Sequence, residues 1–130
     1  MKTTKQILTE ARDAILANPH NLGKGLLVAR NPDADGGLCF CALGHIAKAA
    51  GCKVVINPED EYGNYIAFDT NYAALNRLEA VKALANTISP RDVNDGYCSP
   101  SNIIFRFNDI KRQSPQLIVD MFNKAIDSLP

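Results

Sequence analysis

The C-terminal stretch "SPQLIVDMFNKAIDSL", residues 114–129, carries the clearest structural pattern in the sequence. Its apolar residues recur every three or four positions, so on an α-helix they share one face. Ser114 and Pro115 stand at its start, where a capping hydroxyl and a first-turn proline are favoured. The stretch therefore predicts an amphipathic helix whose apolar face packs against other helices.

Four segments upstream show the same helical spacing. Thr3 and Gln6 form the pattern of a capping box at the start of the first segment. Asp69 or Thr70 is placed to cap the third. The stretch "SPRDVNDGYCSP", residues 89–100, is rich in turn-forming residues and is expected to be a loop. We expect helices at 3–18, 41–50, 71–87 and 100–108.

The β signals are short. "CKVVI" (52–56) and "YIAF" (65–68) flank the polar turn "NPEDEYGN" (57–64), a pattern that predicts a β-hairpin. Residues 26–37 are expected to form a short extended segment and a polar loop. The sequence predicts a mainly α fold with a minor β part: one globular domain, residues 1–130, of about five helices and a small β-hairpin.

Composition excludes several classes of protein. Lys and Arg number 14 and so do Asp and Glu, whereas a non-specific nucleic-acid binder needs excess positive charge. No apolar run reaches the ~20 residues of a membrane span, and no signal peptide is recognised. The four cysteines do not follow a secreted disulfide framework, which favours reduced thiols and a cytoplasmic location. No nucleotide-binding glycine pattern occurs, and no cofactor is expected.

The candidate reactive stretch is "GGLCFCALGHIAKAAG", residues 36–51. Cys41 and His45 are four residues apart and share a helix face. Cys41 also begins the predicted helix, where the helix dipole favours a thiolate. One alternative is a cysteine-dependent hydrolase or transferase, with Asp109 or Asn108 orienting the base His45. The favoured interpretation is that Cys41 is a small buried residue, since free cysteine is among the most buried residue types.

A structural metal-binding domain is the second alternative. Cys39, Cys41 and His45 lie close together in the sequence, and Cys98 would complete a set of four soft ligands. This spacing is not a common zinc pattern. On a helix, Cys52 would lie about 16 Å along the axis from Cys41, too far to share one ion. The sequence therefore favours no metal site.

The Asn108-Asp109 pair lies between two predicted helices. Such pairs cap helix ends through side-chain-to-backbone hydrogen bonds, which is the favoured interpretation. The alternative is that Asp109 is the carboxylate partner of His45 or of Arg106.

The polar segment 57–65 is the favoured binding surface, together with the loop 30–37. It holds three consecutive carboxylates and two nearby tyrosines, and tyrosine is enriched at protein-binding surfaces. The candidate binding residues are Glu59, Asp60, Glu61, Tyr62 and Tyr65.

Three short motifs resemble an uncharacterised family of small bacterial and bacteriophage proteins. They are the glycine-punctuated segment 22–37, the C-x-L-G helix start at Cys41, and the aromatic-Asn-Asp tripeptide at 107–109. The family has alanine where this chain has His45, which weakens a catalytic pair with Cys41. Gly44 costs ~1 kcal/mol relative to alanine within a helix, so a close backbone approach is expected there.

The favoured function is a non-enzymatic protein-interaction domain. The resemblance implies a phage accessory protein that binds a host or defence component. The expected partner is therefore a protein, and neither a membrane nor nucleic acid is expected to be one.

Overall fold

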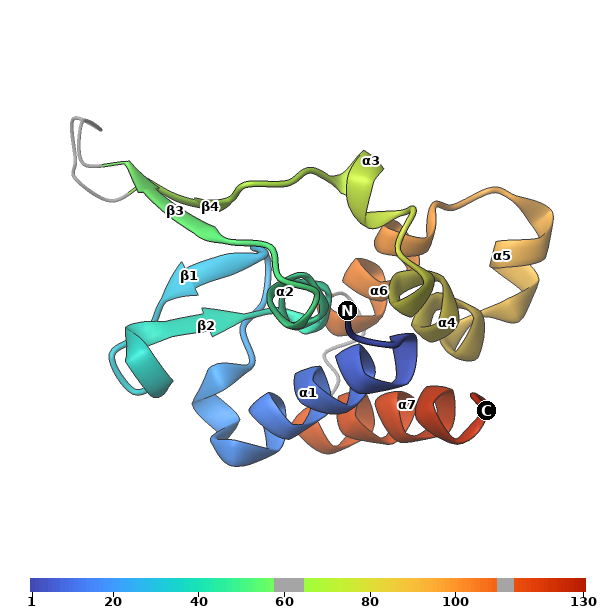
Figure 1. The fold of residues 1–130 in the computed structure, drawn as a ribbon, viewed down its shortest axis with the longest axis horizontal. Helices are drawn as coiled ribbons and strands as arrows, with labels where there is room; N and C mark the ends of the chain where they lie inside the picture. The colour runs from blue at the N-terminus through green and yellow to red at the C-terminus, as the bar shows by residue number, and fades with distance from the viewer. Residues whose placement is uncertain (58–64, 110–113) are drawn as a thin grey trace.

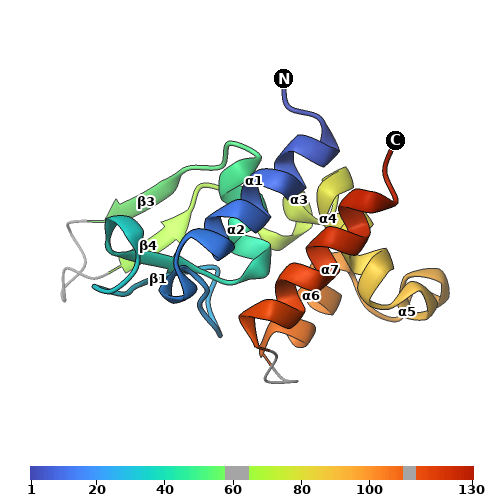
Figure 2. The same ribbon diagram turned by 90° about the horizontal axis from the view of Figure 1, so that it is seen from below.

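Helices α1 (Thr4–Ala17) and α7 (Pro115–Asp127) lie antiparallel and side by side along one face of the molecule (Figure 1, Figure 2). The structure is a computed structural model that describes residues 1–57, 65–109 and 114–130. Because the two helices run in opposite directions, both chain termini lie at the same end of this pair.

Side-chain caps start both helices. Thr3 Oγ1 accepts a hydrogen bond from the Gln6 N–H (3.1 Å), and Gln6 Oε1 accepts one from the Thr3 N–H (2.8 Å). Ser114 Oγ accepts from the N–H of Leu117 at 3.4 Å, and Pro115 occupies the first turn of α7. The capping box and the Ser-Pro start predicted from the sequence are confirmed.

Helix α2 (Ala42–Ala49) lies between α1 and α6 (Pro100–Asp109). Every residue from 41 to 47 is buried, and Lys48 is the first exposed one. The apolar faces of α1, α2 and α7 meet in one hydrophobic core. Its most deeply buried side chains in these helices include Leu8, Ile15, Leu43, Ile46, Ile118 and Phe122.

The segment expected as one helix over 71–87 forms two helices, α3 (Tyr72–Leu75) and α4 (Glu79–Ile88). Leu78 has an extended backbone (φ −72°, ψ 130°), which interrupts the helix before α4. At the break, Asn76 Oδ1 accepts the N–H of Ser101 at 2.8 Å and ties this turn to α6. This tertiary contact overrides the helical spacing of the sequence.

The cap of α3 is Asn71 rather than Asp69 or Thr70. Asn71 Oδ1 accepts the N–H of Ala74 at 2.8 Å. Asp69 Oδ1 instead accepts the N–H of Lys53 at 2.9 Å, at the base of a β-hairpin. The predicted cap at Asp69 or Thr70 is therefore wrong by one or two positions, and Asp69 is engaged by the hairpin instead.

The segment 89–100, expected as a loop, contains α5 (Pro90–Asp95). Ser89 precedes Pro90 just as a serine precedes the proline of α7, and its Oγ donates to Asp92 Oδ2 at 2.8 Å. Gly96 ends the helix in a left-handed conformation (φ +69°). The described residues thus contain seven α-helices rather than about five, and the fold is mainly α with a minor β part.

Two separate antiparallel hairpins form the β part. The predicted hairpin pairs β3 (Val54–Asn57) with β4 (Tyr65–Phe68). A second hairpin, β1 (Val28–Arg30) with β2 (Leu38–Phe40), occupies the region expected as an extended segment and a loop. Its strands are too short to show an alternating pattern. Both hairpins lie at the end of the molecule away from α4 and α5 (Figure 1).

Candidate functional site

The glycine-punctuated segment, the start of α2 and the end of α6 meet at one point, which we call the Asn108 junction. Asn108 is 1% exposed. Its Oδ1 accepts the N–H of Ala42 at 2.9 Å. Its Nδ2 donates to Gly23 O (3.0 Å) and to Asp109 Oδ1 (2.7 Å). The side chain therefore uses its carbonyl oxygen and both of its N–H groups inside the protein.

Asn108 is a helix-capping residue, as the sequence favours, but the helix that it caps is α2, which is distant in the sequence. The first N–H groups of a helix have no partner within that helix. Asn108 satisfies one of them for α2 across 66 positions of the chain. The contact fixes α6 to α2 and to the loop that carries Gly23.

Asp109 anchors the same loop. Its Oδ2 accepts the N–H of Gly25 at 2.9 Å, and Gly25 has a positive φ (+82°) that favours glycine. Its Oδ1 accepts from Asn108, so both carboxylate oxygens are engaged. Neither His45 nor Arg106 is a hydrogen-bond partner of Asp109 within the described residues. The carboxylate acts here on the backbone of the loop.

Cys41 is the N-cap of α2 and is 0% exposed. Its Sγ accepts the N–H of Gly44 at 3.4 Å. Burial raises the pKa of the Cys41 thiol to about 11; the Gly44 N–H opposes this increase, and the Asp109 carboxylate adds to it. A nucleophilic cysteine needs the opposite shift and access to substrate. The geometry at Cys41 is that of a packed, capping thiol.

His45 is also buried, and its Nε2 lies 2.9 Å from the backbone oxygen of Asn21. A carbonyl only accepts hydrogen bonds, so Nε2 carries the proton. Nδ1 has no hydrogen-bond partner within the described residues. Burial, with a contribution from the Lys48 ammonium, lowers the pKa of His45 to about 4. The imidazole is therefore neutral at pH 7 and is committed to the loop before β1.

Gly44 marks a close approach between α2 and the loop at Leu27. A Cβ on Gly44 would overlap the backbone oxygen of Leu27 and would lie 3.2 Å from Phe40 Cβ. The overlapping atom belongs to the backbone, so a side chain could not simply rotate away. The close backbone approach expected from the sequence is confirmed.

The four candidate metal ligands lie on three parts of the chain, with Cys41 and His45 both at the start of α2. Cys39 is buried in β2, and Cys98, between α5 and α6, accepts a long contact from Arg106 Nη1 at 3.8 Å. In the part of the chain that the structure describes, no three His, Cys, Asp or Glu side chains are grouped to hold a metal ion. Cys39, Cys41, His45 and Cys98 therefore do not form a ligand set.

The favoured binding residues fall almost entirely outside the described residues. Glu59, Asp60, Glu61 and Tyr62 lie there, and so does the side chain of Tyr65. What the structure does describe is the pair of strands on either side. Strand β3 carries Val55 and Ile56, which are 46% and 50% exposed.

The loop 30–37 is tied to the body by polar contacts that the sequence did not reveal. Asn21 Nδ2 donates to Asp35 Oδ2 (3.0 Å), and Asn21 Oδ1 accepts the N–H of Asp35 (2.8 Å). Asn18 Nδ2 donates to the other carboxylate oxygen at 3.2 Å. The Asn21 and Asn18 amides lower the pKa of Asp35. This acidic residue is committed to holding the loop.

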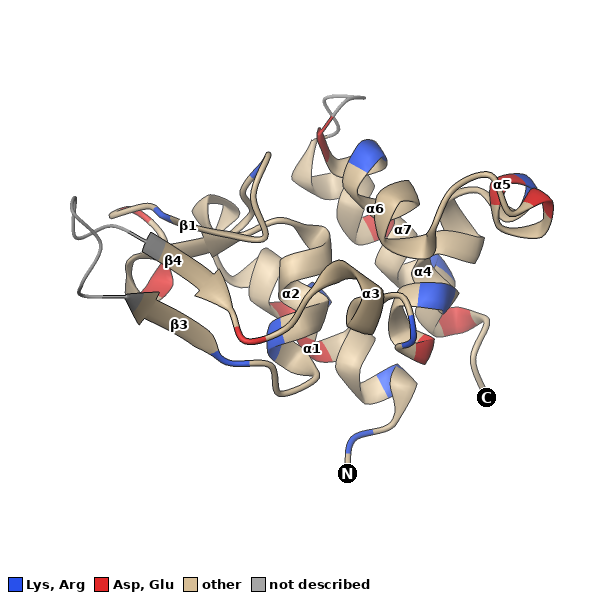
Figure 3. Ribbon diagram, turned by 90° about the horizontal axis from the view of Figure 1, so that it is seen from above, with Lys and Arg blue, Asp and Glu red and all other residues tan. Residues whose placement is uncertain are grey.

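Charged residues of both signs are interspersed along the described part of the chain. Figure 3 places lysine and arginine beside aspartate and glutamate on most helices. Within the described residues, none of the helices has the length and apolarity needed to cross a bilayer.

Comparison with known protein families gives one result. Residues 1–128 match a family described as a family of unknown function, DUF6197. No curated protein matches the chain, and no solved structure does. The match covers all seven α-helices and both hairpins. The chain belongs to the DUF6197 family.

Proposed function

We propose that this protein is a non-enzymatic protein-interaction domain that uses the β3–β4 hairpin as its contact surface. The supporting observation is the exposure of two adjacent strand residues, Val55 (46%) and Ile56 (50%). Consecutive side chains on a strand point to opposite faces. Both faces of the hairpin therefore present apolar side chains to solvent.

The base of the hairpin is packed, which separates it from the exposed part. Val54 pairs with Phe68, and Phe68 is buried with its ring 5.8 Å from that of Phe40. One and two positions further along β3, Val55 and Ile56 leave the core. A rigid base with an apolar extension resembles the anchors of protein interfaces.

The partner is a protein with an apolar surface bordered by basic side chains. The sequence between β3 and β4 contains Glu59, Asp60 and Glu61, which would attract such a border. In the phage or bacterial setting implied by the sequence motifs, a host or defence component is the proposed target. The four unpaired cysteines are compatible with a reducing, cytoplasmic setting.

The cysteine-enzyme alternative has less support. Cys41 is fully buried with a raised pKa, and His45 donates to a backbone carbonyl. An activated nucleophile needs a thiolate within reach of its base. None of the described contacts favours this alternative over the interaction domain.

The test is site-directed photo-crosslinking with a reactive residue at position 56. Captured protein from native host cells is identified by mass spectrometry and purified. Its affinity is then measured against the Val55→Ser, Ile56→Ser double variant. We expect at least about tenfold weaker binding, because apolar anchors at an interface contribute more than 1 kcal/mol each.

Leu117→Ser is the matched control, because Leu117 is 45% exposed on α7, away from the hairpin. It should leave the affinity unchanged. A second variant, with Glu59, Asp60 and Glu61 all changed to lysine, should also weaken binding. Unaltered affinity in the Val55, Ile56 variant would exclude the hairpin as the contact surface.

A further inference from the structure

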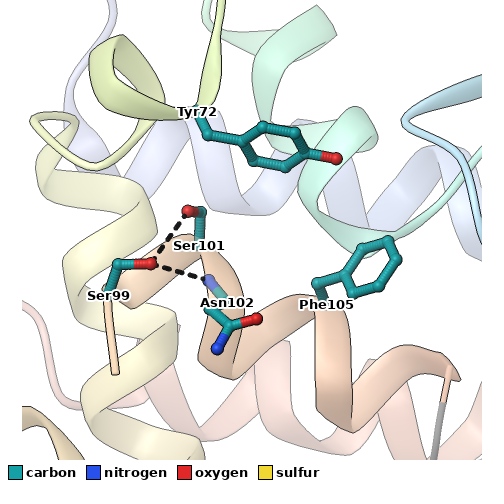
Figure 4. A pocket seen from close by; sticks show the side chains of 5 residues that line it. All are labelled: Tyr72, Ser99, Ser101, Asn102 and Phe105. Carbon is teal, nitrogen blue, oxygen red and sulfur yellow. Dashed lines mark hydrogen bonds between the residues drawn. The ribbon is translucent and has the colours of Figure 1, made fainter. Parts of the chain in front are cut away.

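A cleft outside the hairpin lies between α3 and the start of α6. Its volume is about 360 Å³, within the range of small-molecule sites. Figure 4 shows the side chains that surround it. They are Tyr72, Ser99, Ser101, Asn102 and Phe105.

Two aromatic rings border this cleft. Tyr72 comes from α3 and Phe105 from the second turn of α6, so the rings approach from different elements (Figure 4). Tyr72 is about half exposed, and Phe105 is outside the hydrophobic core. Neither ring is therefore needed to fill the interior, and both are available to contact the face of a planar molecule.

The polar groups at the cleft are neutral. Ser99, Ser101 and Asn102 supply hydroxyl and amide groups, and none of the described residues that line the cleft is charged. The Asn102 side chain has no hydrogen-bond partner within the described residues and offers both a donor and an acceptor. This set can recognise the polar edge of an uncharged ring.

The start of α6 is not arranged to bind an anion. The N–H of Ser101 donates to Asn76 Oδ1 (2.8 Å), and the N–H of Asn102 donates to Ser99 Oγ (3.3 Å). Two of the N–H groups that would hold a phosphate are thus occupied. Burial, with the negative charge of Asp109 nearby, raises the pKa of Tyr72. The Tyr72 hydroxyl therefore stays protonated at pH 7 and adds no charge to the cleft.

We propose that this cleft binds a small, uncharged, planar heteroaromatic molecule of nucleobase size. The faces of the ligand contact the rings of Tyr72 and Phe105. Its polar edge exchanges hydrogen bonds with Asn102 and Ser99. The site is independent of the hairpin and of the protein partner proposed above.

The test is an NMR titration of the ¹⁵N-labelled full chain with adenosine, nicotinamide and indole as separate probes. At least one probe should give saturable shifts at residues 72 and 99–105 below about 10 mM, the affinity accessible to ligands of this size. Inorganic phosphate and cyclohexanol test the anion and the non-planar apolar alternatives. The proposal would be overturned if none of the three planar probes saturates these residues. Preferential binding of phosphate or cyclohexanol at the same residues would also overturn it.

Variants assign the binding to the cleft. Tyr72→Leu and Phe105→Leu each remove one ring and should lower the affinity for the probe at least about fivefold. Tyr97→Leu is the matched control, because Tyr97 is 87% exposed and does not line the cleft. If a ring variant does not fold, the affinity of Asn102→Ala for the probe is measured instead. Asn102 is exposed, and its replacement removes a proposed hydrogen bond to the ligand. Equal affinity in the ring variants and the control would contradict the assignment.

Discussion

The Asn108 junction and the β3–β4 hairpin differ in how many of their side chains the fold itself uses. At the junction, every polar atom of the Asn108 and Asp109 side chains has a hydrogen-bond partner, either between the two residues or in the segments at Gly23, Gly25 and Ala42. On the hairpin, Val55 and Ile56 remain about half exposed. Residues with no internal role are the ones available to a partner.

This comparison assigns opposite roles to the two kinds of sequence motif. The cysteine, histidine, asparagine and aspartate that looked chemically active lie in or beside the junction and hold the fold together. The apolar strand residues Val55 and Ile56, which look ordinary in the sequence, are the ones whose side chains remain exposed to solvent. A substitution should therefore reduce stability at the junction and reduce binding at the hairpin.

The largest expected effect on stability is that of Asn108→Ala. It leaves the Ala42 N–H and the Gly23 oxygen without their partner, and each buried unsatisfied group costs about 1–3 kcal/mol. We expect a loss of about 3–5 kcal/mol in urea unfolding at pH 7. Asn94→Ala, on the exposed surface of α5, should stay within about 0.5 kcal/mol. A loss below about 1 kcal/mol for Asn108→Ala would show that the hydrogen bonds of the Asn108 junction do not stabilise the fold.

The second effect is a pH dependence that belongs to His45. Its pKa falls from an ordinary value of 6.5 to about 4 in the folded protein, so the unfolded chain binds the proton more readily. The stability from the neutral imidazole is complete above pH 6.5 and is lost as pH falls towards 4. By linkage the loss is about 3 kcal/mol.

The matched pair for that prediction is His45→Gln and His20→Gln. Urea midpoints between pH 7 and pH 4.5 should depend much less on pH in His45→Gln than in the parent. His20 is exposed, and its replacement should leave the slope as it was. Identical slopes in His45→Gln and the parent would show that the buried imidazole is not the titrating group.

Gly44→Ala should have the next largest effect on the free energy of unfolding, and the sign of this change is informative. Replacing glycine by alanine inside a helix normally stabilises by about 1 kcal/mol. Here the new methyl group meets the backbone oxygen of Leu27, so we expect a destabilisation of about 2–3 kcal/mol. In Gly23→Ala the nearest atom is Cys39 Sγ at 2.9 Å, a side-chain atom that can move, and a smaller loss should result. Thermal unfolding of both variants checks the order.

The smallest effect is expected on the hairpin. Val55→Ser should change the free energy of unfolding by less than about 0.5 kcal/mol. Val54→Ser, one residue earlier, removes a side chain that packs against the core and should cost about 1–2 kcal/mol. Equal losses at positions 54 and 55 would mean that the hairpin is stabilised along its whole length and has no free surface.

Local signals predicted most of the helices and the β3–β4 hairpin, whereas contacts between residues distant in the sequence could not be predicted. The capping box at Thr3 and Gln6 lies within one turn, so its pattern is complete in four letters. The Ser-Pro start was equally readable at Ser89, and α5 was missed because turn-forming residues surround it.

The junction could not be located in this way. Asn108 is recognisable as a capping residue, but its partner Ala42 is 66 positions away, and the Gly25–Asp109 contact spans 84. The cleft has the same difficulty, since Tyr72 and Phe105 come from different helices. The close backbone approach at Gly44 was predicted, because a glycine within a helix indicates a close neighbour. The sequence did not indicate that this neighbour is Leu27.

Alkylation of Cys41 tests the central claim most directly, namely that the conspicuous thiol is interior structure. Native protein is treated with iodoacetamide, and each cysteine is followed by peptide mass spectrometry. The alkylation rate of Cys41 should be lower than that of the partly exposed Cys98 by a factor on the order of 10³ or more, because the reagent reaches Cys41 only when the protein unfolds. Modification of Cys41 ahead of Cys98 in the folded protein would contradict the account.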